Sequence, residues 1–144
     1  MVVKRPLSDE EIAEEAARPL PYFPHDSDAA SDIKMRRLLR RCGFEGYGRW
    51  WRLCELMAQT DGHAVPVSTE EDAEILADEL GFDGISDLMG WLNLVEDVGL
   101  IDVDRLGEGE VWSDRMGKNA RFVGMQRACG KLGGRPKGST KKSA

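Results

Sequence analysis

Cysteine and histidine are scarce in this chain of 144 residues. The three cysteines, Cys42, Cys54 and Cys129, form no Cys-x-x-Cys pair, and His25 and His63 are the two histidines. A structural zinc site takes four closely spaced ligands of these types, and a disulfide framework needs paired cysteines. The sequence therefore predicts no metal site and no cofactor. It favours reduced thiols that pack as small apolar side chains.

Long apolar runs are also missing. No segment approaches the ~18 to 20 apolar residues that a membrane-spanning helix requires. The amino terminus, residues 1–6, has no apolar stretch of the kind that signal peptides carry. We therefore expect a cytoplasmic protein without membrane contact. A length of 144 residues with 41% hydrophobic and 32% charged residues fits one ordinary domain with a buried core.

Basic residues are absent from the middle of the chain. Residues 53–104 contain 14 acidic side chains and no lysine or arginine. Residues 34–52 contain seven basic and one acidic side chain, and residues 105–144 contain ten basic and three acidic ones. The net charge of −6 thus conceals two basic segments. Such a distribution concerns the partners of the protein rather than its fold.

Capping signals and apolar periodicity predict a mainly helical fold. A capping box at Ser8 opens the first helix, Ser31 or Asp28 caps the second, a second capping box begins at Ser68, and Ser86 caps the fifth. The expected helices cover residues 9–18, 32–42, 46–60, 69–80, 86–98 and 114–129, with Gly43 ending the second. The helix 46–60 is apolar nearly all round, so it is expected to be central, with Trp50 and Trp51 in the core.

Three short segments read as strands. Residues 65–67 predict an edge strand because of Pro66, and residues 100–104 and 109–112 flank a Gly-x-Gly turn as a β-hairpin. This order of elements is that of a winged helix, a helix-turn-helix followed by a β-hairpin wing. We expect an N-terminal arm with a short helix over 1–19, the winged-helix domain over 20–129, and a disordered basic tail over 130–144.

Two segments of the sequence resemble a known family. The first, Tyr-Phe-Pro-His-Asp from residue 22, is followed by Asp-x-Lys at residues 32–34, and the second reads Gly-Phe-Glu-Gly-Tyr-Gly from residue 43. Both are similar to the N-terminal domain of phage replisome-organiser proteins of the listeria type. The residues that carry the match are Tyr22, Phe23, His25, Asp26, Asp32, Glu45, Gly46, Tyr47, Gly48, Trp51 and Glu55.

The resemblance implies a winged-helix domain in phage or mobile-element replication, with a role in origin binding or helicase loading. It extends in outline over residues 20–125. The Gly-Gly-Arg-Pro-Lys tail also often follows this domain, but such proteins usually carry a further C-terminal region. The chain is thus expected to be either a single-domain version or a truncated one.

His25 and Asp26, with Asp28 and Asp32 nearby, have two interpretations. They could form a catalytic or metal cluster, or a polar network that fixes the N-terminal arm to the aromatic helix. A nucleophile needs a base and an orienting group, and no serine or cysteine motif accompanies these residues. The structural interpretation is therefore favoured, and no enzyme is expected.

The helix in the recognition position, 86–98, has no cation. Its expected outward residues are Asp87, Asn93, Glu96 and Asp97, whereas recognition helices read bases mostly with arginine, lysine, asparagine or glutamine. DNA is therefore expected to contact the basic residues of 34–52, of the last helix and of the tail instead.

The Arg-Pro-Lys tail has two interpretations, a minor-groove hook or nonspecific attraction to phosphates. The basic helix faces could also be merely solvated. The candidate nucleic-acid-binding residues are Lys34, Arg36, Arg37, Arg40, Arg41, Arg49, Arg52, Arg115, Lys118, Arg121, Lys131, Arg135, Lys137, Lys141 and Lys142.

Two functions from different classes remain open. One is a DNA-binding replication module that contacts phosphates through basic helices and the tail. The other is a protein adaptor whose acidic surface, residues 53–104, docks a basic replication partner such as a helicase loader. No small-molecule substrate is expected in either case.

Overall fold

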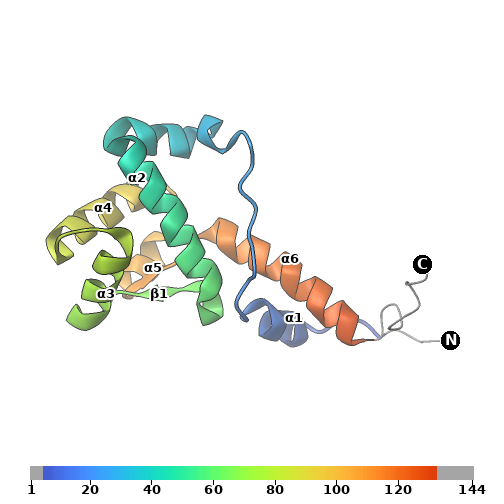
Figure 1. The fold of residues 1–144 in the computed structure, drawn as a ribbon. Helices are drawn as coiled ribbons and strands as arrows, with labels where there is room; N and C mark the ends of the chain where they lie inside the picture. The colour runs from blue at the N-terminus through green and yellow to red at the C-terminus, as the bar shows by residue number, and fades with distance from the viewer. Residues whose placement is uncertain (1–4, 133–144) are drawn as a thin grey trace, which may run out of the picture.

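The computed structural model describes residues 5–132 and is mainly helical over this range (Figure 1). The elements in chain order are α1 (Asp9–Ala16), a 3-10 turn (Ala29–Ser31), α2 (Ile33–Gln59), a second 3-10 turn (Asp61–His63), β1 (Val65–Pro66), α3 (Glu70–Leu80), α4 (Ile85–Asp97), α5 (Val103–Gly107), β2 (Glu110–Val111) and α6 (Asp114–Lys131). None of the described helices is both long and apolar enough to cross a membrane.

Side-chain caps set the start of most helices. The Ser8 hydroxyl accepts a hydrogen bond from the Glu11 backbone N–H, and the Glu11 carboxylate accepts one from the Ser8 N–H, so this capping box is confirmed. Ser113 caps α6 by accepting a hydrogen bond from the Met116 N–H. Such a cap contributes about 1 kcal/mol because it satisfies an otherwise unpaired donor of the first helical turn.

Three expected caps are wrong by one to four residues. Asp32, not Ser31 or Asp28, caps α2 by accepting from the Lys34 N–H at 3.0 Å. Thr69 rather than Ser68 caps α3, and α4 begins directly after Gly84 rather than after Ser86. At each of these sites several neighbouring residues are suited to capping or turning, so local sequence does not decide among them.

A sharp bend at Gly43 divides α2 into two segments (Figure 1). Gly43 has φ 69° and ψ −169° inside an otherwise helical stretch. Only glycine occupies this region of backbone space without strain. The helix end expected at Gly43 is therefore a change of direction within α2. The two expected helices are its first arm, residues 33–42, and its second arm, residues 44–59.

The expected hairpin of residues 100–104 and 109–112 is wrong. The Asp102 carboxylate accepts a hydrogen bond from the Arg105 backbone N–H at 2.8 Å and thereby caps α5, which takes up the end of the expected first strand and the expected turn. β2 pairs instead with β1 in antiparallel register, with Val65 opposite Val111. The Asp102 N–H still donates to the Trp112 carbonyl at 2.9 Å, so the segment before α5 lies beside the segment after β2.

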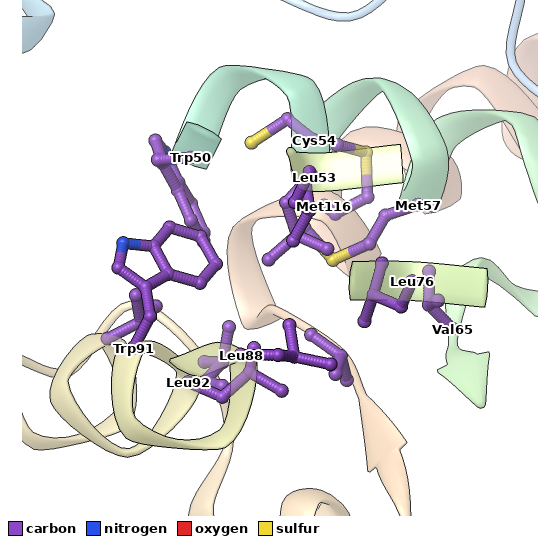
Figure 2. Packing of buried hydrophobic residues seen from close by; sticks show 14 of the residues in the cluster. Trp50, Leu53, Cys54, Met57, Val65, Leu76, Leu88, Trp91, Leu92 and Met116 are labelled. Atoms are coloured by element: carbon purple, nitrogen blue, oxygen red, sulfur yellow. The ribbon is translucent and has the colours of Figure 1, made fainter. Parts of the chain in front are cut away.

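The core lies between the second arm of α2 and the α3–α4 pair. Figure 2 shows Trp50, Leu53 and Met57 of α2 facing Leu88 and Trp91 of α4. The apolar side chains that recur at core-facing helical spacing in α3 and α4 are buried, as that spacing predicts. Trp50 is only 5% exposed, which confirms its core position. Trp51 is half-buried and packs at the edge of the core.

Helices α1 and α6 pack along each other on the side of the molecule remote from α3 and α4 (Figure 1). A Cβ at Gly124 of α6 would lie 2.7 Å from the backbone nitrogen of Ala16, so glycine permits this close approach. The Glu15 side chain is buried at the junction and forms ion pairs with Arg18 and Lys131. These contacts extend α6 to Lys131, two residues beyond its expected end.

Candidate nucleic-acid interface

The first arm of α2 has one buried side and one basic side. Met35 and Leu38 are buried, whereas Arg36, Arg37 and Arg40 are exposed. The helical repeat of 3.6 residues explains this division, because positions 36, 37 and 40 lie on the side opposite the apolar positions. We call Arg36, Arg37 and Arg40 the arginine face.

The arginine face has no acidic partner, whereas most of the other described cations have one. Within residues 5–132, the basic side chains without an ion pair or a side-chain hydrogen bond are Lys34, Arg36, Arg37 and Arg40. All four belong to the first arm of α2. Lys34 lies somewhat apart from the face, with its aliphatic chain along Gly99. Positive charge is therefore concentrated where no carboxylate neutralises it.

The other three predicted residues of the 34–52 segment hold α2 against α3 and α4. Arg41 pairs with Asp97 of α4 at 2.6 Å, and Arg52 pairs with Glu79 of α3 at 2.6 Å. The hydrogen bond to Glu79 raises the pKa of Arg52. Arg49 donates to the carbonyls of Leu80 and Gly81 at the end of α3 and lies over the Phe82 ring. These arginines have structural roles, which sequence spacing did not indicate.

The predicted basic residues of α6 each lie near an acid. Arg115 pairs with Asp26 at 2.6 Å, Lys118 with Asp114 at 3.1 Å, and Arg121 lies 3.7 Å from Asp9. All three side chains are mostly exposed, and such surface pairs are worth only about 0 to 1 kcal/mol. Lys131 pairs with the buried Glu15. The predicted positions Arg135, Lys137, Lys141 and Lys142, and the tail over 133–144, lie outside the described residues.

The family-like motif builds a stacked aromatic cluster. The His25 ring stacks on Trp51 with 3.6 Å between the ring centroids, and Phe23 stacks beside Trp51 at 6.2 Å. Tyr47 meets Trp51 edge-on. Asp26 pairs with Arg115 of α6, so the segment before α2 is tied to two helices. This arrangement supports the structural interpretation of His25 and Asp26.

The other motif residues have separate local positions. Asp32 caps α2, Glu45 pairs with Arg49, and Glu55 pairs with Arg52. Gly46 is buried where a Cβ would lie 2.1 Å from the Cys42 Cβ, too close for any other residue without a shift. Tyr22 is 72% exposed, and Gly48 is exposed as well. Within residues 5–132 there is no group of three potential metal ligands.

A groove of about 700 Å³ opens between the 23–32 segment, α2, residues 99–103 and the start of α6. Its lining includes Lys34 and Arg115, but also Asp32, Glu96 and Asp102. Charges of both signs therefore face this groove, which does not favour a polyanion there. Sequence patterns could not indicate this groove, because its walls come from segments distant along the chain.

Phe44 is an exposed aromatic residue that sequence reasoning did not single out. It directly follows the Gly43 bend and is 82% exposed, the most exposed large apolar side chain of the described residues. Burial raises the pKa of the Cys54 thiol to about 12, and burial also raises the pKa of the Cys42 thiol.

Comparison with known proteins gives a family but no relative of established function. No curated protein and no solved structure matches the chain significantly. The family model described as Lin1244/Lin1753-like, N-terminal, matches residues 22–113. This range includes the aromatic cluster, the arginine face, α3, α4 and both strands. The chain belongs to the Lin1244/Lin1753-like N-terminal domain family.

Proposed function

We propose that the chain is a non-enzymatic, cytoplasmic DNA-binding module of winged-helix type that serves phage or mobile-element replication. In this proposal the arginine face contacts DNA phosphates. The observation that carries the proposal is the concentration of unpaired cations on the first arm of α2. A row of exposed guanidinium groups without acidic partners attracts phosphates and releases counterions when it binds them.

The order of elements supports the winged-helix assignment. A short strand, β1, precedes the α3–α4 pair, and its partner β2 follows that pair. In this scheme α3 and α4 are the helix-turn-helix, and the segment from Asp102 to Trp112 is a wing whose first strand is replaced by α5. The replication role rests on the resemblance of the aromatic motif to phage replisome-organiser domains.

The α4 helix is not the proposed DNA-reading element. It contains no lysine or arginine, and its exposed side includes Asp87 and Asp97. A carboxylate placed about 4 Å from a phosphate is repelled by about 1 kcal/mol even at the dielectric constant of water. The arginine face lies on α2, so DNA on that face need not enter the groove position of a standard helix-turn-helix.

Charge removal at the arginine face tests the proposal. Arg36→Gln with Arg40→Gln should weaken binding to a labelled duplex and lower the log–log salt slope by about 1.8, at ~0.9 per phosphate contact. The matched control, Lys118→Gln with Arg121→Gln, removes the same charge from α6, where both residues lie near acids. Fluorescence anisotropy over a salt series measures both. An equal loss in the two variants, or no salt-dependent binding by the wild type, would contradict the proposal.

A specific observation favours a protein adaptor as a second candidate. Ile75 is 55% exposed in the middle of α3, and the neighbouring Glu71, Glu74 and Asp78 are exposed as well. An apolar residue ringed by acids suits a basic amphipathic helix. Calorimetry with a synthetic helix of lysines and leucines should then show binding that Ile75→Asp weakens. If Ile75→Asp leaves that affinity unchanged, the adaptor surface is not at α3.

A further inference from the structure

We infer that the arginine face and Phe44 together form a binding site for single-stranded nucleic acid. This inference rests on the proposed function and names its substrate class. The arginines supply phosphate contacts, and the Phe44 ring supplies a platform on which an unpaired base stacks. Combining cationic side chains with exposed aromatic rings is the general way in which proteins hold single strands without reading their sequence.

Packing within the fold does not explain why Phe44 is exposed, whereas binding of a ligand would. Its side chain is 82% exposed, so it contributes little to the core, and Glu45 and Gly48 on the same turn are exposed too. The ring follows Arg40 by four residues, across the Gly43 bend. An exposed apolar ring four residues after the last arginine of the row offers a stacking platform for a strand whose phosphates contact the arginines.

The length of the site suits a short run of nucleotides. Arg36 and Arg40 lie four residues apart, about 6 Å along the helix axis at 1.5 Å per residue. A stacked strand carries about one phosphate per 3.4 Å, so about two to three phosphates face this length. The three arginines of the face therefore match the phosphates that one short bound segment presents.

The surroundings of the face favour one strand over two. A helix face is only about 10 Å wide, and α4 lies next to it, joined by the Arg41–Asp97 ion pair. Asp97 is 67% exposed, and α4 also carries Asp87 and Glu96 without any lysine or arginine. A duplex carries phosphates on both sides of a groove about 6 or 12 Å wide, so its second strand would meet these acids. The bases of a duplex also keep their flat faces inside the stack, away from Phe44.

The decisive experiment compares one labelled strand of mixed sequence with the same strand annealed to its complement. The wild type should bind the single strand more tightly than the duplex. Phe44→Ala should weaken single-strand binding by roughly 5- to 100-fold, the range observed for loss of one stacked base, and should change duplex binding by less than about 2-fold. Phe44→Trp keeps an aromatic face and should bind the single strand as tightly as the wild type. Circular dichroism checks that each variant is folded.

Phe122→Ala is the matched control, because Phe122 is 63% exposed on α6, away from the arginine face. It should leave both affinities unchanged. If Phe44→Ala has no effect on the single strand, or weakens the duplex equally by losing a wedge between base pairs, the inference is wrong although the arginine variant can still uphold DNA binding. If neither form of DNA binds in a salt-dependent way, the proposed function itself fails.

Discussion

At the scale of single residues, charge is used in two distinct ways in this molecule. Arg41, Arg49 and Arg52 stabilise contacts between helices, whereas Arg36 and Arg40 point to solvent. All five belong to one basic segment of the sequence. Composition therefore identified the segment, but only the bend at Gly43 and the position of α4 separate the structural arginines from the exposed ones.

Glu15 leads to a prediction about pH. Hydrogen bonding from Lys131, with a smaller contribution from Arg18, lowers the pKa of this carboxyl below its usual 4.5 although burial opposes the shift. A carboxyl with a lowered folded-state pKa stabilises the fold above its unfolded-state pKa, and this contribution disappears as the pH falls through the lower value. Glu15→Gln should therefore lower the urea midpoint near neutral pH, and the difference from the wild type should shrink below about pH 4.5.

The control for this experiment is Glu14→Gln, since Glu14 is exposed on the same helix and has no ion pair among the described residues. Its urea midpoint should follow that of the wild type from about pH 7 to about pH 3. A Glu15→Gln difference that is constant over this range would show that packing, rather than ionisation, is what Glu15 provides.

At the scale of elements, the inward faces of the helices were predictable and the structure of residues 100–112 was not. Ala73, Leu76 and Leu80 recur at helical spacing, and tertiary packing buries them as that spacing predicts. Residues 100–103 alternate like a strand, yet Asp102 caps a helix and the Val103 side chain is 61% exposed. The aspartate was the available signal, because a short polar side chain before a helical turn competes with strand pairing.

The Gly43 bend carries the second prediction. With φ 69° and ψ −169°, any other residue is strained at this position, at a cost of about 1 to 3 kcal/mol. Gly43→Ala should lower the free energy of unfolding by this amount, as measured by urea denaturation followed by circular dichroism. Gly48→Ala in the same helix meets no atom within 4 Å and should be neutral or stabilising by up to ~1 kcal/mol. Equal effects of the two substitutions would rule out backbone strain at the bend.

At the scale of the whole molecule, the charges segregate into an acidic body and basic regions, as the sequence indicated. The acids of α3 and α4 lie on one part of the fold, and the arginine face lies on the first arm of α2. Sequence could not place the candidate site further. The pairing of Arg41 with Asp97, and the exposure of Phe44, both depend on how distant segments meet.

The last prediction concerns the basic residues beyond α6. Arg135, Lys137, Lys141 and Lys142 follow the described residues in sequence. A chain ending at Leu132 should keep its fold, because the Leu132 N–H already donates to the Cys129 carbonyl at the end of α6. Removing the four cations should lower the salt slope of duplex binding by up to ~3.6, at ~0.9 per phosphate contact. Anisotropy over a salt series measures the slope for the truncated and full chains.

Combining this truncation with Arg36→Gln and Arg40→Gln shows whether the two basic regions act separately. If each region contacts its own phosphates, the two changes in binding free energy should add to within about 0.3 to 0.5 kcal/mol. If the acids of α3 and α4 instead compete with DNA for the cations of the tail, truncation should lower the salt slope by clearly less than ~3.6, because fewer tail cations then contact phosphates. An unchanged slope after truncation would leave the phosphate contacts to the arginine face alone.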